Sequence, residues 1–406
     1  MRIDYTSFFK SALDAVQSEG RYRTFADIER VCGDFPLARR HRNDGTVDYI
    51  TVWCSNDYLG MGQNKDVLAA MHNAIDEVGA GAGGTRNIAG TTHYHVQLEK
   101  ELADLHGRER GLLFTSGYIA NEATLATLAR LLPGCVILSD ELNHASMIEG
   151  IRGGRGPKLI WRHNDLAHLE ELLQTLPPET PKVVAFESVY SMDGDFAPIK
   201  EILDLADKYN AFTYLDEVHG VGLYGDQGGG LAQAQGVAHR VGCIEGTLGK
   251  AFGIMGGYIV GDDIMVDAVR SYASSFIFTT ALSPVLVAGA LQSAKLLRKG
   301  NELRAKHQER AAKLKEMMRL AELPIMDSPS HIVPLIIGDP IECKAVADTL
   351  LDEHGIYVQP INYPTVSKGT ERLRFSPSPL HTDEHMRILV EALKEIWVAR
   401  GLRRAA

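Results

Sequence analysis

Between residues 111 and 273 the chain alternates between short apolar runs and amphipathic segments, and this alternation restricts the fold more than any other feature. The apolar runs predict strands and the intervening segments predict helices. Val-, Ile- and Leu-rich strands separated by helices are typical of a mostly parallel sheet covered on both faces. We therefore expect an α/β fold whose ligands bind beyond the carboxyl ends of the strands. The predicted strands are 111–115, 135–139, 158–162, 182–187, 211–216, 243–247 and 257–260, and the predicted helices are 92–106, 118–131, 144–151, 165–174, 198–209 and 262–273.

The pattern changes on both sides of this region. Upstream, we expect a helix over 3–19 with Ile3, Phe8, Ala12, Leu13 and Val16 on one face, a β-rich run at 49–53 and a helix over 67–78. Downstream of Pro284, long helices precede short strands, which indicates a smaller α+β domain. The expected organisation is a short N-terminal segment (1–60), a large α/β domain (61–290) and a C-terminal α+β domain (291–406). The downstream helices are predicted over 284–298 and 301–321, and the strands over 332–336, 356–360 and 372–375.

Composition narrows the class of protein. The 52 acidic and 42 basic residues give a net charge of −10, which argues against nucleic-acid binding. The five cysteines are odd in number and scattered, so we expect a reduced protein without disulfides or a structural zinc. The first residues lack the apolar core of a signal peptide and the Arg-rich, acid-poor character of a transit peptide. A cytoplasmic location is expected.

Two motif matches do not carry their usual function. The run 79–84 fits the dinucleotide fingerprint G-x-G-x-x-G, but that motif follows a strand and opens a helix. Here a predicted helix comes first and an irregular stretch, 85–88, comes after. The run 381–385 fits the metalloprotease pattern H-x-x-E-H. Thr382 resembles the N-cap of the last helix, which puts His381 outside that helix and separates the two histidines.

Lys250 is the first candidate for chemistry. It lies within the glycine-rich run 246–253, where small residues allow a bulky planar group to approach the backbone. Asp216 ends an apolar strand 34 residues earlier, in a segment that continues to His219. A carboxylate can hold a pyridine nitrogen protonated, and a reachable lysine amine can form a Schiff base. A strand-end cap and a surface lysine explain either residue alone, but together they fit a pyridoxal phosphate enzyme.

The phosphate of such a cofactor needs its own site. Residues 115–118 lie between a strand and a helix, so their amides would form a helix N-terminus suited to an anion. Thr247 supplies a hydroxyl beside Lys250, and 278–280 adds a hydroxyl pair. Two more strands end in polar runs, at 139–144 and 187–195. Polar groups at five strand ends on one sheet are better explained by one site than by five separate caps.

Four runs also resemble the α-oxoamine synthases, which are pyridoxal phosphate enzymes that condense an amino acid with an acyl-CoA and release carbon dioxide. The resemblance covers nearly the whole chain and implies an aminotransferase-like fold and a homodimer with shared active sites. The runs are Leu-Asn-His-Ala-Ser (142–146), Glu-Ser-Val-Tyr-Ser-Met-Asp-Gly-Asp (187–195), Asp-Glu-Val-His-Gly-Val-Gly (216–222) and Gly-Thr-Leu-Gly-Lys-Ala-Phe-Gly (246–253).

Further runs at 20–23, 52–61, 84–91 and 361–366 resemble the members that use glycine and succinyl-CoA. Thr85 stands where relatives with larger substrates more often have serine. Its methyl group would narrow the pocket toward glycine, worth only ~1–3 kcal/mol of selectivity. A related glycine enzyme that uses acetyl-CoA remains the alternative, as does a catalytically silent cofactor-binding protein. Arg23 argues against the first, and the intact Lys250 against the second.

The resemblance implies a role for each site residue. Lys250 would be the Schiff-base lysine and the general base and acid, Asp216 would pair with the ring nitrogen, His144 would stack on the ring and His219 would bond its phenolic oxygen. The phosphate would bind Ser116, Gly117, Tyr118 and Thr247, with Thr279 and Thr280 contributed by the partner subunit, and Ser191 would lie near the cofactor. Arg374 with Asn56 would bind the glycine carboxylate. Arg23, Thr85, Asn87, Ile88, Ser139, Lys158 and Thr365 would form the succinyl-CoA site.

Overall fold

The computed structural model describes residues 3–404, so the first two residues of the predicted segment 1–60 and the last two of 291–406 lie outside the described residues. The chain divides into two compact units. The first unit combines 1–55 with 191–194 and 306–406, and the second combines 56–190 with 195–305. Most of the two terminal segments predicted from the sequence therefore belongs to the same unit.

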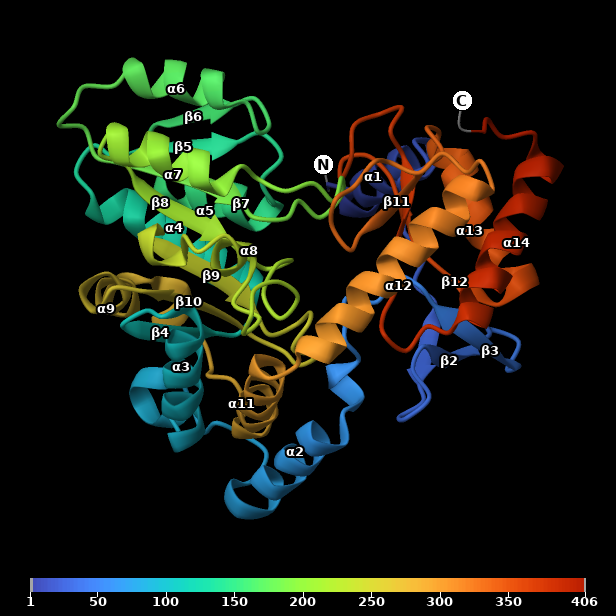
Figure 1. Ribbon diagram of the computed structural model, residues 1–406, viewed down its shortest axis with the longest axis horizontal. Helices are drawn as coiled ribbons and strands as arrows, with labels where there is room; N and C mark the ends of the chain where they lie inside the picture. The colour runs from blue at the N-terminus through green and yellow to red at the C-terminus, as the bar shows by residue number, and fades with distance from the viewer. Residues whose placement is uncertain (1–2, 405–406) are drawn as a thin grey trace. The chain divides into compact units, whose positions relative to one another are not determined.

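A seven-stranded sheet forms the centre of the second unit (Figure 1). Its order is β4-β10-β9-β8-β7-β5-β6, and β10 runs antiparallel to both of its neighbours while the other pairings are parallel. This confirms the predicted mostly parallel sheet. The strands are β4 (Arg110–Phe114), β5 (Val136–Asp140), β6 (Lys158–Trp161), β7 (Lys182–Glu187), β8 (Phe212–Asp216), β9 (Cys243–Thr247) and β10 (Gly257–Gly261).

Apolar residues on one face of this sheet pack against helices α4, α5 and α9 in a single core cluster. Phe114, Ile137 and Tyr214 represent the strands in that cluster, and Ala120 and Met147 represent the helices. Helices α6 and α7 instead contact β6, β8 and each other. The helices of this unit include α2 (Lys65–Val78), α3 (His93–His106), α4 (Gly117–Leu131), α5 (Ala145–Gly154), α6 (Leu166–Gln174), α7 (Ile199–Lys208), α8 (Leu231–Ala234), α9 (Asp263–Tyr272), α10 (Ser274–Ile277) and α11 (Pro284–Arg298).

The glycine run 79–84 follows α2, which ends at Gly79 with a positive φ of 79°. A helix before the run is the opposite of the dinucleotide-binding arrangement, so the rejection of that motif is confirmed. The expected irregular stretch 85–88 was wrong in part, because Arg86–Gly90 forms a short π-helix.

The first unit contains two smaller sheets and a core of its own. Strands β1, β2 and β3 are antiparallel and β12 joins β3 in parallel, while β14 lies between β11 and β13. The predicted strand 356–360 was wrong, because its two ends belong to different sheets as β12 and β13. The strands are β1 (Asp27–Arg30), β2 (Leu37–His41), β3 (Val47–Val52), β11 (Val333–Ile336), β12 (Ile356–Tyr357), β13 (Pro360–Ile361) and β14 (Arg372–Phe375).

Trp53 from the N-terminal part and Leu393 from the C-terminal part share one apolar core in this unit. This packing joins the two ends of the chain, a long-range contact that sequence periodicity does not report. Within the described residues, the helices of this unit are α1 (Tyr5–Ser18), α13 (Pro340–His354), α14 (Asp383–Arg400) and most of α12 (Asn301–Leu320). Thr382 caps α14 by accepting from the His385 amide, as predicted, and His381 lies outside the helix.

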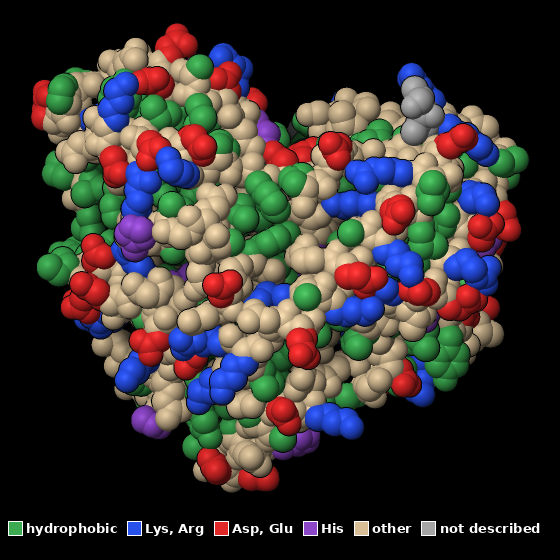
Figure 2. Space-filling view, viewed as in Figure 1, with side chains coloured by type: hydrophobic (Ala, Val, Ile, Leu, Met, Phe, Trp, Pro, Cys, Tyr) green, Lys and Arg blue, Asp and Glu red, His purple; other side chains and the backbone are tan. Residues whose placement is uncertain are grey.

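Charged side chains of both signs are interspersed on the visible face of the molecule (Figure 2). None of the helices within residues 3–404 combines the length and apolar character needed to cross a membrane.

Candidate active site

The amine of Lys250 is held three residues beyond the end of β9. Its Nζ lies 3.0 Å from Nε2 of His219, and Nδ1 of that histidine lies 2.8 Å from the hydroxyl of Tyr58. His219 and Tyr58 are buried, whereas Lys250 is partly exposed. The buried histidine and tyrosine fix one side of the amine, and its partial exposure keeps it reachable.

Asp216 ends β8, the strand next to β9. One carboxylate oxygen accepts from Asn121 Nδ2 at 2.7 Å and the other from the Val218 amide at 2.8 Å. Asn121 is itself held by the hydroxyl of Tyr214, which donates to its Oδ1 at 2.8 Å. Asp216 is 4% exposed, so its direction is fixed by buried hydrogen bonds.

His144 precedes α5, at the end of the β5 connection. Its ring Nδ1 lies 2.7 Å from the Ser146 hydroxyl, and its backbone amide donates to Glu187 Oε1 at 2.6 Å. Burial lowers the pKa of His144, partly offset by the charge of Asp216, and Lys250 lowers it further. A neutral imidazole follows at physiological pH, which suits packing against a flat ring better than a cation would.

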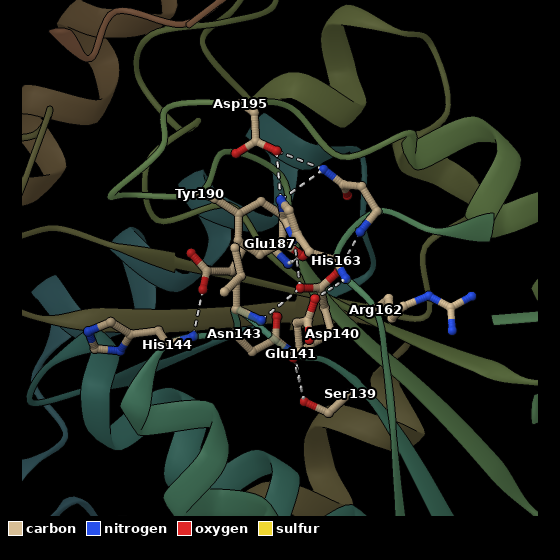
Figure 3. A network of polar contacts seen from close by, with 12 residues as sticks. Ser139, Asp140, Glu141, Asn143, His144, Arg162, His163, Glu187, Tyr190 and Asp195 are labelled. Atoms are coloured by element: carbon tan, nitrogen blue, oxygen red, sulfur yellow. Dashed lines mark hydrogen bonds and ion pairs between the residues drawn. The ribbon is translucent and has the colours of Figure 1, made fainter. Parts of the chain in front are cut away.

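A second histidine ties together the loops beside His144 (Figure 3). His163 lies between two carboxylates, with Nδ1 2.8 Å from Asp140 Oδ1 and Nε2 2.7 Å from Asp195 Oδ2. Burial alone would lower the pKa of His163, but its hydrogen bonds to Asp140 and Asp195 outweigh that effect and raise the pKa to about 10. The imidazolium therefore fixes the ends of β5 and β6 to the segment after β7.

The anion site was predicted at the amino end of α4. Ser116 is the N-cap, and its Oγ accepts from the Ile119 amide at 3.2 Å. Because Gly257 has no side chain, the backbone of β10 lies close to the start of α4. A Cβ on Gly257 would lie 2.4 Å from the Gly117 nitrogen. Thr247 Oγ1 donates to the Gly256 carbonyl at 3.0 Å and lies beside Gly117. Tyr118 is 45% exposed.

The other predicted residues of this unit are spread along its surface and strand ends. Thr85 pairs with Thr280 in an isolated β-bridge, and Thr279 and Thr280 line a small cavity together with Thr115. Ser139 is buried and its Oγ accepts from Asn143 at 2.9 Å. The remaining four side chains are exposed, namely those of Asn56, Asn87, Ile88 and Lys158.

The first unit holds the two arginines predicted to bind carboxylates. Arg374 lies on β14, is 8% exposed and donates from Nη1 to the Ser191 carbonyl at 3.2 Å. Arg23 is exposed and donates from Nη2 to Thr365 Oγ1 at 3.2 Å. Arg23 and Thr365 both line a cavity of about 870 Å³. The structure thus places Arg374 against Ser191 and Arg23 against Thr365, two contacts that the sequence did not predict.

Four residues that contact or neighbour Asp216, His144 and His219 were not singled out from the sequence, namely Asn121, Tyr58, Glu187 and Glu245. Asn121 is a polar residue on a helix that is otherwise largely buried, and Glu245 is the one carboxylic acid within a buried strand. Both are exceptions to the local pattern, and such exceptions are a usable signal of a functional neighbourhood.

The residues present fit pyridoxal phosphate. Such a cofactor needs an amine, a carboxylate for its ring nitrogen and an anion site for its phosphate. Because β4, β8 and β9 run in the same direction, their carboxyl ends bring the N-terminus of α4, Asp216 and Lys250 to one edge of the sheet.

Comparison with known proteins identifies the family. The sequence profile of the aminotransferase class I and II family matches residues 49–393. The chain is 58% identical over 403 residues to the 5-aminolevulinate synthase of Rhizobium meliloti (strain 1021), covering 99% of this chain and 100% of that relative. It is also 58% identical over 405 residues to the 5-aminolevulinate synthase of Paracoccus denitrificans (strain Pd 1222), covering 99% of each chain.

A solved structure supports the same assignment. Serine palmitoyltransferase from S. paucimobilis, with bound PLP–myriocin aldimine, superimposes with a TM-score of 0.91 at 30% identity, covering 98% of this chain and 100% of that chain. The profile and the relatives each span most of the chain or all of it. This chain therefore belongs to the class I and II aminotransferase family and, within that family, to the 5-aminolevulinate synthases.

Proposed function

We propose that this chain condenses glycine with succinyl-CoA to give 5-aminolevulinate, CoA and carbon dioxide, the first step of tetrapyrrole and haem synthesis. The observation that carries the proposal is that Asp216 ends β8 and Lys250 follows the carboxyl end of the adjacent parallel strand β9. The full-length identity with 5-aminolevulinate synthases supplies the substrates.

Bound pyridoxal phosphate would act as the electron sink at glycine Cα. Asp216, fixed by Asn121 and Val218, would hold the ring nitrogen. His219 would meet the phenolic oxygen, and His144 would lie against the ring. The phosphate would bind at the amino end of α4, where backbone amides and the helix dipole favour an anion. Its ligands would be Ser116, Gly117, Tyr118 and Thr247, with Ser191 near the cofactor.

Lys250 would move the proton. Its amine takes a proton from glycine Cα, and Cα then forms a bond to the succinyl carbonyl carbon as CoA leaves. The former glycine carboxylate leaves as carbon dioxide, and Lys250 returns a proton to the same carbon. The contact with His219 Nε2, at 3.0 Å, keeps the amine directed into the site.

Two carboxylates must be oriented for this reaction, one on each substrate. Arg374, buried on β14, suits the glycine carboxylate because a guanidinium binds a carboxylate through two parallel hydrogen bonds. Asn56 would assist it. Arg23, hydrogen-bonded to Thr365 beside the cavity of the first unit, suits the succinyl carboxylate. The rest of the acyl-CoA site would comprise Thr85, Asn87, Ile88, Ser139 and Lys158.

The substrate assignment is tested by acyl-CoA competition. Purified holoenzyme is mixed with glycine and either succinyl-CoA or acetyl-CoA. We then measure free CoA together with 5-aminolevulinate from succinyl-CoA or the corresponding amino ketone from acetyl-CoA. We expect kcat/KM to be about tenfold higher with succinyl-CoA, because only the succinyl group offers a carboxylate to the exposed Arg23. Equal values with the two thioesters would favour the glycine C-acetyltransferase-type activity instead.

The proposal includes a homodimer in the cytoplasm. Helix α1 leaves Phe8, Phe9 and Leu13 more than half exposed (68%, 69% and 52%), and Ile3, just before the helix, is 61% exposed. Phe278, beside Thr279 and Thr280, is 80% exposed. Apolar surface of this kind is typical of an interface. The five cysteines are all free thiols, as a reducing compartment requires.

Subunit mixing tests the shared site. Lys250→Ala and Thr279→Ala/Thr280→Ala chains are each expected to be impaired, and refolding them together would create hybrid dimers with one intact site. About a quarter of the normal activity should return if Thr279 and Thr280 act across a twofold interface. No recovery, with hybrid dimers present, would contradict shared sites.

A further inference from the structure

Glu245, in the middle of β9, has no part in the reaction described above. Its side chain is completely buried, and neither carboxyl oxygen receives a hydrogen bond from an N–H or O–H donor among residues 3–404. An isolated buried carboxylate is among the most costly groups in a protein interior. Glu245 therefore needs either a proton or a partner.

Its partner across the sheet is Asp216. The two residues are directly paired on the parallel strands β8 and β9, so their side chains leave the sheet on the same face. Side chains at such directly paired positions are close neighbours on the face that they share. Because two ionised carboxylates can only accept, a bond between them forms only when one of them carries a proton.

The other contacts of the pair decide which group is protonated. Asp216 accepts from Asn121 Nδ2 and from the Val218 amide, and both bonds favour its ionised form. Glu245 has no such donor. The proton that the pair shares therefore lies on Glu245.

The charges around Glu245 agree with this assignment. Burial raises the pKa of Glu245 well above its usual range, the negative charge of Asp216 and then that of Glu187 add to the effect, and only Lys250 opposes it. The other titratable neighbours are acids that add no positive charge, namely Tyr214, Cys243 and Tyr258.

The amino end of α4, where the phosphate is proposed to bind, lies close to Glu245. A Cβ on Gly117, the first residue of α4, would lie 3.0 Å from Glu245 Oε1. An ionised Glu245 would place a negative charge beside amides that are suited to an anion. A neutral carboxylic acid does not oppose that anion.

We propose that Glu245 is a positioning residue that stays protonated and donates a hydrogen bond from its carboxylic acid to the Asp216 carboxylate. The bond fixes Asp216 and leaves the pair with one negative charge, so that a single carboxylate faces one protonated ring nitrogen. The match between one carboxylate and one ring nitrogen rests on the proposed role of Asp216. The proton on Glu245 is independent of that role.

Infrared spectroscopy tests the proton directly in the holoenzyme. At pH 7 the wild-type protein should show protonated-carboxyl absorption, to which buried Glu187 and Glu217 also contribute, and this band should lose intensity in Glu245→Gln. Glu101→Gln, which removes a carboxylate paired with Arg298 Nη1 at 2.9 Å, is the matched control and should keep the band. An unchanged band in Glu245→Gln would overturn the proposal. If that variant does not fold, Glu245→Met is measured in its place with the same two outcomes.

The pH dependence of unfolding gives a second readout. A raised folded pKa stabilises the protein fully below the unfolded pKa, and this contribution is lost as the pH rises toward the folded pKa. The unfolding constant of the wild type, divided by that of Glu245→Gln, should therefore rise by up to about tenfold per pH unit above pH ~5. A ratio that does not change with pH would contradict a protonated Glu245.

Cofactor affinity tests the positioning role. Glu245→Ala should weaken pyridoxal phosphate binding about tenfold, because Asp216 loses the donor that Glu245 supplies. Glu245→Gln should bind the cofactor within about threefold of the wild type, because its amide N–H can donate instead. Equal losses in the two variants would refute positioning through a hydrogen bond. A weakened infrared band with no 5-aminolevulinate synthesis would reject only the proposed function.

Discussion

The strand-end region of the second unit and the cavity beside Arg23 in the first unit hold their proposed functional groups in different ways. Asp216 and His219 are 4% and 6% exposed and are fixed by buried partners. Arg23 is exposed, and the hydrogen bond described for its guanidinium joins it to the equally exposed Thr365. The groups proposed to act on bonds are thus built into the core, whereas those proposed to recognise the acyl chain lie on surface segments. Changes in the first region should affect kcat, and changes in the second should affect KM.

The largest effect is expected at Lys250. Lys250→Ala should lower the rate of 5-aminolevulinate formation by about 10⁴-fold or more, because the proton-transferring amine is gone. Steady-state assays of the cofactor-loaded variant measure this effect. Lys200→Ala, which removes an exposed lysine from α7, is the control and should keep the normal rate. Residual activity above about a tenth would show that another group moves the proton.

Arg374 should give the next largest effect. Arg374→Ala should lower kcat/KM for glycine by about 10²- to 10³-fold through loss of two charge-assisted hydrogen bonds. Arg372 is the matched position on the same strand, but its Nη1 pairs with Asp193 Oδ1 at 2.7 Å. Arg372→Ala should therefore reduce stability, measured by urea unfolding, more than it raises the KM for glycine. Similar kinetic losses in both variants would contradict a specific role for Arg374.

Arg23 should give a smaller and different effect. Arg23→Ala should raise the KM for succinyl-CoA by about tenfold and leave kcat within about threefold, because an exposed ion pair contributes modestly. Arg21→Ala is the matched control, since Arg21 lines the same cavity but pairs with Glu19 at 2.6 Å. A large fall in kcat for Arg23→Ala would remove the contrast between the two regions.

The smallest effect on catalysis is expected at His163, because its charge acts on stability. Its pKa is raised to about 10 in the folded protein, so its charge stabilises the fold fully below pH ~6.5 and that contribution is lost as the pH rises toward about 10. The advantage of the wild type over His163→Gln should shrink by at most ~1.4 kcal/mol per pH unit across this window. Urea midpoints at several pH values measure it, and a constant gap would show that His163 is not charged.

Local patterns in the sequence predicted much of the second unit. The seven strands and the positions of Asp216 and Lys250 at strand ends follow from apolar runs that end in polar residues, and the predicted parallel sheet and cofactor class are confirmed. The individual roles of the site residues stay predictions. The register that pairs Glu245 with Asp216 could not be predicted, because it depends on strand order. The contacts of His163 with two carboxylates could not be predicted either, because they are long-range.

The first unit was harder to predict for the same reason. Strands β1 and β2 are short and polar, and 356–360 contributes to two sheets instead of one. Trp53 packs with residues more than 250 positions away, such as Leu314 and Leu393. No periodic pattern within a short window reports such contacts.

The central claim is that the Lys250 amine moves the proton of glycine Cα, and hydrogen exchange tests it most directly. The holoenzyme is incubated with glycine in deuterated buffer without acyl-CoA, and exchange at Cα is followed by NMR. We predict exchange of one Cα hydrogen by the wild type and by Arg23→Ala, and none above background by cofactor-loaded Lys250→Ala. Exchange by Lys250→Ala at the wild-type rate would contradict the account.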